Sequence, residues 1–261
     1  MIFNFGFNNY NVKKIFYFFI FLFLFSNCLY AKSFFDYPIS SLVIDAGHGG
    51  NDSGAIASYS FAPTIYEKDI VLDIALKVEK YVNKELPKLE IIQTRVDDTY
   101  LSLQERSEIG YNYEIENKTS SLYVSIHANS AKNKEASGVE IFTKLENKIV
   151  HLFDEKTPIE NIDLFVNEDL YTLNKKQYQT SFELASTILN SIVNNFLNIN
   201  NRGIKSEDLY VLNVCRTSAC LIEVGFISNE DEAKLLLDNS YRDKMAKSIA
   251  TGIVKYIKNR R

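Results

Sequence analysis

Cysteine and histidine are scarce in this sequence, with three of each among 261 residues. Cys215 and Cys220 flank the tetrapeptide Arg-Thr-Ser-Ala, a spacing that does not match a cysteine-based metal site. We interpret both as small buried apolar residues, while a disulfide between them stays open for an exported chain. The cysteine pattern therefore argues against a structural metal site with cysteine ligands.

The chain also lacks an excess of positive charge, internal repeats and a long low-complexity linker. Lysine and arginine together number 29 against 33 aspartates and glutamates, a formal net charge of −4. A mildly acidic chain argues against nucleic acid as a partner. The length is ample for one domain with its own core, which we expect over residues 40–260.

One long hydrophobic run is present, from Ile15 to Phe25 near the N-terminus. It follows two lysines and spans about 11 residues, which is typical of a signal-peptide core and too short to cross a bilayer by itself. We expect residues 1–31 to form a signal peptide that is cleaved near Ala31, with export to the periplasm or cell envelope. The alternatives are an uncleaved anchor and lipidation of Cys28, and either would attach the protein to a membrane.

Short apolar runs alternate with amphipathic segments along the rest of the chain. Thr180-x-x-Glu183 is a capping box that predicts the start of one helix. Strands separated by helices predict an α/β fold, with a mostly parallel twisted sheet of about six strands, helices on both faces and a helical insertion. Strands are expected at 41–46, 89–94, 121–127, 138–143, 208–213 and 219–225, and helices at 67–86, 102–114, 181–198 and 241–258.

Two of the histidines lie in turns that follow apolar runs. His48 is in VIDAGHGGNDSG (43–54) and His127 is in YVSIHANS (123–130). Because open α/β folds place functional groups at the carboxyl edge of the sheet, both imidazoles are expected there. Glu67 lies in the first turn of the helix at 67–86, where its carboxylate points back toward the strand ends. Two imidazoles and one carboxylate are a recognised ligand set for catalytic zinc, so His48, Glu67 and His127 predict a site for one Zn²⁺.

A carboxylate interrupts a third apolar run, LIEVGFISN (221–229). Glu223 would be costly to bury there without a partner, which favours a functional role. Zinc lowers the pKa of water and polarises a carbonyl group, while a nearby carboxylate can move a proton from water to a leaving nitrogen. The residues therefore indicate metal-assisted hydrolysis of an amide, with Glu223 as the general base.

Several separate motifs follow one another along the chain: VIDAGHGGNDSGA (43–55), EKDI (67–70), TRVDDTYLSLQER (94–106), SIHAN (125–129), SGVEIF (137–142), NRGIK (201–205) and LIEVGFISNEDE (221–232). In this order they resemble the zinc-dependent N-acetylmuramoyl-L-alanine amidases of bacteria, cell-wall amidase family 3 of the cell-separation type. The resemblance covers nearly the whole chain after residue 40. It implies a catalytic amidase domain over 40–260, with His48, Glu67 and His127 as metal ligands and Glu223 as the catalytic glutamate.

The resemblance also implies the substrate, the amide between N-acetylmuramic acid and L-alanine in peptidoglycan, and a role in cell-wall remodelling and daughter-cell separation. The residues alone leave two alternatives. One is a zinc peptidase or deacetylase that acts on another cell-wall amide. The other is a peptidoglycan-binding protein without turnover, against which the unsubstituted ligands and Glu223 count.

Arg106 and Asn129 are weaker candidates for substrate binding, and each has two interpretations. Arg106 lies in LSLQER at an expected helix start, where it either contacts substrate or forms an ion pair. Asn129 follows His127 by two residues and either bonds the substrate peptide or shapes the turn. His151, the third histidine, has no such context and is interpreted as an exposed polar residue.

The segment 144–179 is long for a connection within a compact domain and carries scattered acidic residues. Some cell-division amidases carry an insertion here whose helix covers the zinc cleft until a partner protein displaces it. By resemblance in position, we predict that 144–179 is a regulatory insertion opened by an activator protein. Glu155, Glu160 and Glu168 are the candidates for a contact with the open zinc position. The alternative is a surface-packed excursion without a regulatory role.

Overall fold

The computed structural model describes residues 33–111, 119–153, 157, 159, 162, 165 and 168–260. The expected signal peptide, residues 1–31, lies outside the described residues. Within the described part of the chain, no helix is both long enough and apolar enough to cross a membrane.

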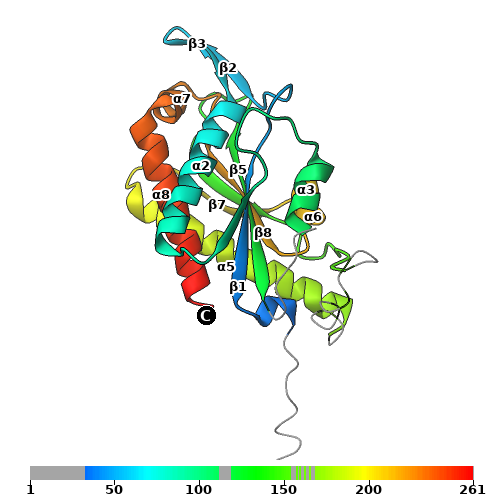
Figure 1. The fold of residues 1–261 in the computed structure, drawn as a ribbon. Helices are drawn as coiled ribbons and strands as arrows, with labels where there is room; N and C mark the ends of the chain where they lie inside the picture. The colour runs from blue at the N-terminus through cyan, green and yellow to red at the C-terminus, as the bar shows by residue number, and fades with distance from the viewer. Residues whose placement is uncertain are drawn as a thin grey trace, which may run out of the picture. The chain divides into compact units, whose positions relative to one another are not determined.

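A six-stranded sheet forms the centre of the domain, in the strand order β4-β1-β5-β8-β6-β7 (Figure 1). Paired neighbours are parallel, except that β6 runs antiparallel to β8. This arrangement confirms the predicted α/β fold with a mostly parallel sheet. The strands are β1 (Ile39–Ala46), β4 (Glu90–Gln93), β5 (Ser120–Asn129), β6 (Val139–Thr143), β7 (Asn201–Ser206) and β8 (Ser218–Phe226).

Alternate residues of each strand face two different layers of helices, because side chains alternate across a sheet. On one face the strands pack against α2 (Glu67–Glu85), α5 (Leu170–Asn195) and α8 (Asn239–Lys258), which form the larger core. On the other face, Val43, Tyr123, Phe142 and Leu221 pack against α3 (Leu103–Tyr111) and α6 (Tyr210–Asn213). Figure 1 shows α2 and α8 on one side of the sheet and α3 and α6 on the other.

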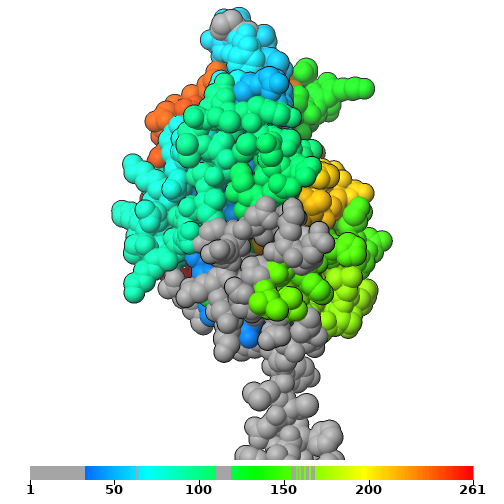
Figure 2. Space-filling model, turned by 45° about the vertical axis from the view of Figure 1, so that its right-hand side comes forward, coloured from blue at the N-terminus to red at the C-terminus, as the bar shows by residue number. Residues whose placement is uncertain are grey.

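Three smaller elements were not expected from the sequence. The antiparallel hairpin of β2 (Ile56–Tyr59) and β3 (Ala62–Tyr66) precedes α2 and protrudes at the top of Figure 2. A short 3-10 helix, η1 (Phe34–Asp36), precedes β1, and α7 (Glu230–Leu237) follows β8. The hairpin places Glu67, the first residue of α2, directly after its second strand.

Two predictions are wrong, the strand at 208–213 and the start of the helix at 181–198. The structure has the helix α6 in place of a strand at 208–213, and the edge strand is β7, which carries the NRGIK motif. Helix α5 begins at Leu170, because the Asp169 side chain accepts a hydrogen bond from the Thr172 N–H at 2.9 Å and caps the helix there. Thr180 lies inside α5, where its hydroxyl donates to the Lys176 carbonyl, so it does not form a capping box.

The described residues of 144–179 pack near the amino end of β1. Val150, Leu152, Phe165 and Leu173 form an apolar cluster with Phe34 and Phe35 of η1, which leads into β1. The carboxyl ends of β1 and β5, where the sequence predicts the functional groups, lie at the opposite edge of the sheet. The part of the predicted insertion that the structure describes is thus anchored away from that edge.

Helices α5 and α8 come into close contact at Gly252. A Cβ on this residue would lie 2.5 Å from the Cα atom and 3.0 Å from the backbone nitrogen of Ile188. Only the absence of a side chain allows the two backbones to approach this closely.

We expect Gly252→Ala to lower the free energy of unfolding by about 1–3 kcal/mol, because the new methyl group overlaps the backbone of α5. In an exposed helix the same change would stabilise by roughly 1 kcal/mol. Urea denaturation compares it with Thr251→Ala, an exposed neighbour in α8 that should change stability little. A denaturation midpoint for Gly252→Ala at or above that of the unmodified chain would contradict the tight helix contact.

Candidate metal centre

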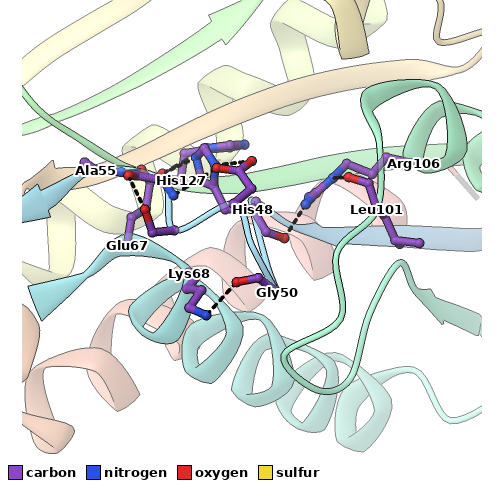
Figure 3. A network of polar contacts seen from close by, with 12 residues as sticks. His48, Gly50, Ala55, Glu67, Lys68, Leu101, Arg106 and His127 are labelled. Carbon is purple, nitrogen blue, oxygen red and sulfur yellow. Dashed lines mark hydrogen bonds and ion pairs between the residues drawn. The ribbon is translucent and has the colours of Figure 1, made fainter.

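Three side chains from three elements converge at the carboxyl edge of the sheet (Figure 3). His48 follows β1, Glu67 opens α2, and His127 lies near the end of β5. The Oε1 atom of Glu67 is 3.2 Å from His48 Nε2 and 3.0 Å from His127 Nδ1. One ligand atom from each residue lies within 4.8 Å of the other two. The structure therefore brings together the three residues that the sequence predicts to hold a metal.

Hydrogen bonds orient two of these side chains toward their common centre. The Glu67 carboxylate accepts from the Ala55 N–H at 2.8 Å and from the Ala128 N–H at 3.0 Å. His48 directs Nδ1 to the Asp52 carboxylate at 2.9 Å, which leaves Nε2 facing Glu67. Partners of this kind fix the tautomer and the ring orientation of a metal-binding histidine.

The turn that carries His48 has an unusual backbone. His48 has a φ of 61°, in the left-handed region that few residues other than glycine occupy. At the preceding residue, Gly47, a Cβ would lie 2.3 Å from Cε1 of His127. The glycine thus lets the two histidines approach, and the strained conformation of His48 must be held by surrounding contacts.

Arg106 supplies several of these contacts, and the structure favours its interpretation as an ion-paired residue. Its side chain is buried and donates to the Asp45 carboxylate at 3.0 Å, to the Ala46 carbonyl at 2.7 Å and to the His48 carbonyl. Its Nε donates to the Leu101 carbonyl at 3.0 Å (Figure 3). All three guanidinium nitrogens are engaged within the protein, so the arrangement does not support a substrate contact.

Asp45 and Arg95 complete this support and were missed in the sequence. Asp45 also accepts from the Thr94 hydroxyl at 2.8 Å and the Ser125 hydroxyl at 2.7 Å. Burial by itself would raise the pKa of Asp45, but Arg106 and the hydroxyl donors outweigh it and lower the pKa. Arg95 donates to the carbonyls of Ala46 at 3.0 Å and Gly47 at 2.7 Å. Two buried arginines therefore hold the backbone that presents His48.

The electrostatics of Glu67 suit a metal ligand. Burial would raise the pKa of this carboxyl, but hydrogen bonds from His127 and His48 outweigh the burial and lower the pKa far below its usual range. The charged carboxylate form of Glu67 is therefore favoured. A negatively charged oxygen between two imidazole nitrogens is a suitable environment for a divalent cation.

Glu223 lies beside His127, because the two residues are paired in the register of β5 and β8. Burial raises the pKa of Glu223 to about 7, His127 opposes this rise, and the negative charges of Glu67 and Glu140 add to it. Its Oε2 atom is buried and has no hydrogen-bond partner among the described residues. Glu223 is therefore a carboxyl that can gain or lose a proton near neutral pH.

Asn129 contacts a further carboxylate that sequence reasoning missed. Its Nδ2 donates to Oε1 of Glu140 at 2.6 Å, and Glu140 is paired with Glu223 in the register of β6 and β8. Glu140 also binds Arg202 at 2.7 Å and Lys205. The signal was present in SGVEIF, where a carboxylate interrupts an apolar strand as Glu223 does in LIEVGF.

The remaining predicted residues lie elsewhere or outside the described residues. Glu168 binds Lys176, which also binds Asp36 of η1, so Glu168 lies near the amino end of β1 and not at the three converging side chains. Glu155 and Glu160 lie outside the described residues. His151 is exposed. Cys215 and Cys220 are buried and free, as small apolar residues would be.

We expect Arg106→Ala to lower the free energy of unfolding by about 3–5 kcal/mol, because it leaves the buried Asp45 charge without its partner. Lys148→Ala, which removes the exposed ion pair with Asp208, should change it by less than about 1 kcal/mol. Urea denaturation of both variants measures the difference. Equal small losses would show that the buried pair does not anchor the His48 turn.

Known proteins share both the sequence pattern and the fold. The model of the family described as N-acetylmuramoyl-L-alanine amidase matches residues 42–255. A putative N-acetylmuramoyl-L-alanine amidase of Buchnera aphidicola subsp. Acyrthosiphon pisum is 33% identical over 235 residues, 83% of this chain and 94% of the relative.

Two solved structures extend the likeness to three dimensions. An N-acetylmuramoyl-L-alanine amidase from Clostridium difficile 630 has a TM-score of 0.65 at 28% identity, covering 85% of this chain and 98% of that chain. The CwlD amidase of Clostridioides difficile, solved in complex with the GerS lipoprotein, has a TM-score of 0.63 at 30% identity, covering 84% and 99%. The chain therefore belongs to the family of N-acetylmuramoyl-L-alanine amidases, which hydrolyse the amide bond between N-acetylmuramic acid and L-alanine in peptidoglycan.

Proposed function

We propose that this amidase is zinc-dependent, with His48, Glu67 and His127 as the metal ligands and Glu223 as the general base, and that it acts in cell-wall remodelling and daughter-cell separation. The observation that carries the chemical part of the proposal is the convergence of the three ligand atoms next to Glu223. The role in cell separation follows from the resemblance of the motifs alone.

The donor set fits zinc. Nitrogen and oxygen ligands about 2.0–2.2 Å from a tetrahedral zinc ion would lie roughly 3.3–3.6 Å from one another. The distances from Glu67 Oε1 to the two imidazole nitrogens, 3.2 and 3.0 Å, are close to that spacing. Three protein ligands leave one position open, and zinc held there supplies Lewis acidity toward a carbonyl oxygen and lowers the pKa of water.

Glu223 performs the proton transfers. Its carboxylate takes a proton from the attacking water as the new C–O bond forms on the lactyl carbonyl carbon. It then delivers that proton to the alanine nitrogen as the C–N bond breaks, which yields a carboxylate and a free amine. Burial, which raises the pKa of this carboxyl above its usual value, favours a group that accepts and then donates a proton.

We also propose that residues 1–31 direct export to the cell envelope and that a partner protein controls the enzyme. The first rests on the charged start and the short apolar core of the N-terminus. The second is supported by the similar CwlD amidase, which was solved in complex with the GerS lipoprotein. The described contacts of 144–179 favour a structural role for that part of the segment.

Removal of metal by a chelator should abolish turnover, and zinc should restore it. We expect His48→Ala and His127→Ala to weaken zinc binding by more than about 100-fold, because even changes to the partners of metal ligands cost 10- to 100-fold. His151→Ala, at the exposed third histidine, is the matched control and should bind zinc as the unmodified chain does. Competition with a chromophoric chelator measures the affinity, and similar affinities for all four proteins would refute this ligand set.

Glu223→Gln should retain zinc and lose turnover by roughly 10²- to 10⁴-fold, because the amide cannot accept the proton of water. The assay is mass spectrometry of stem peptides with a free L-alanine amino end, released from purified peptidoglycan. Glu183→Gln, on the exposed surface of α5, is the control and should be fully active. Full activity of Glu223→Gln would assign the proton transfers to another group.

A further inference from the structure

The polar residues of the site continue in a row across one face of the sheet. His127 is paired with Glu223, and Glu223 with Glu140, so these side chains lie on the same face of three adjacent strands. Glu140 in turn binds Arg202 and Lys205 of β7. β7 is the edge strand of the sheet. The row thus runs from the metal ligands to two cations at the edge.

The guanidinium of Arg202 is held in place with one side free. Its Nε donates to Glu140 Oε2 at 2.7 Å, and its Cζ lies 4.8 Å from the centre of the Phe226 ring. Among the residues that the structure describes, none bonds its two terminal nitrogens. These nitrogens form the planar fork that matches the two oxygens of a carboxylate.

The surroundings of this fork are open and carry positive charge. The Arg202 side chain is 31% exposed and that of Lys205 is 38% exposed. Gly203 lies between the two cations in the sequence, and a Cβ on it would meet no atom within 4 Å. Glu140 neutralises one of the two positive charges, so the group of Glu140, Arg202 and Lys205 has a net charge of +1. The Glu232 carboxylate also lies in the field of Arg202, but its two oxygens accept from the backbone N–H groups of Gly138 and Phe226. A cation pair of this kind attracts an anion and repels another cation.

We propose that Arg202, supported by Lys205, binds a free carboxylate of the stem peptide on the leaving-group side of the scissile amide. This proposal rests on the proposed function and specifies which part of the substrate lies over β6 and β7. N-acetylated sugars carry no charge, whereas stem peptides carry carboxylates. The charge of the group therefore fits the peptide and not the glycan strand.

The spacing also fits. Adjacent strands lie about 4.8 Å apart, so a guanidinium bound to Glu140 is roughly 5–10 Å from the Glu223 carboxyl. An extended peptide advances about 3.3–3.6 Å per residue, which puts a carboxylate on the residue after alanine about 7 Å from the scissile nitrogen. A peptide whose alanine nitrogen faces Glu223 can thus reach the Arg202 fork with its second residue.

Glu140 and Asn129 then have a defined task. Glu140 orients the Arg202 fork through Nε, and Asn129 fixes the other oxygen of Glu140 at 2.6 Å. Hydrogen bonds from Lys205 and Arg202 lower the pKa of Glu140 against the effect of burial, so it stays charged. Arg202 is a substrate-binding residue in this scheme, and Glu140 and Asn129 are positioning residues.

The test uses two soluble disaccharide-peptide substrates that differ only in a carboxylate or a carboxamide on the second stem residue. With the zinc-loaded unmodified enzyme, we expect the carboxamide to raise KM roughly 10- to 100-fold with little change in kcat, since it loses a charge-assisted pair. Arg202→Ala should raise KM for the carboxylate substrate by a similar factor and remove the discrimination. Arg202→Lys keeps the charge beside Glu140 without the fork and should discriminate to an intermediate degree.

Lys244→Ala is the matched control, because Lys244 also lies over an aromatic ring, 4.4 Å from the centre of Phe196, but on the helix α8. It should leave both KM values unchanged. Equal KM values for the two substrates with the unmodified enzyme would overturn the carboxylate subsite. So would an equal rise in KM for the carboxylate and the carboxamide substrate in Arg202→Ala and in Arg202→Lys. If the zinc-loaded unmodified enzyme turns over neither substrate, the proposed function is overturned instead.

Discussion

The buried ion pair between Asp45 and Arg106 is the interaction on which the site depends. It joins the end of β1 to α3, and the same guanidinium binds the carbonyls of Ala46 and His48. Without these bonds, the left-handed conformation of His48 would have little to hold it against its intrinsic strain. The cost of burying two charges is met here by hydrogen bonds to nearly every polar atom of the pair.

A second constraint is the alternation of side chains along the strands. On the α3 and α6 face, each central strand carries an apolar residue and then, toward the functional edge, a polar one: Val43 and Asp45, Tyr123 and Ser125, Leu221 and Glu223. β6 runs in the opposite direction, so its polar residue, Glu140, precedes its apolar residue, Phe142. One face of one sheet thus holds both a packed core and a row of charged groups, because α3 and α6 cover only the apolar part.

Much of the fold was predictable from local patterns. Five of the expected strand segments and the helix at 67–86 match elements of the structure, because their apolar residues have a clear period of strand or helix. The strand predicted at 208–213 is wrong because a short apolar run has the same pattern in a strand and in a buried helical turn. The prediction that Thr180 caps a helix is wrong because Asp169 caps the same helix at its actual start, Leu170.

The sequence by itself determined which residues are the candidates for the chemistry. His48, His127 and Glu223 stand out because two imidazoles follow or end apolar runs and a carboxylate interrupts a third, and Glu67 completes a ligand set typical of catalytic zinc. Only the tertiary structure decided what surrounds them. Arg106 anchors a turn, Glu140 lies beside Glu223, and Arg202 at the sheet edge has two terminal nitrogens that no described residue bonds. The reason is physical, since each of these contacts joins residues more than 50 positions apart. Strand order and register determine such contacts, and no local sequence pattern encodes either of them.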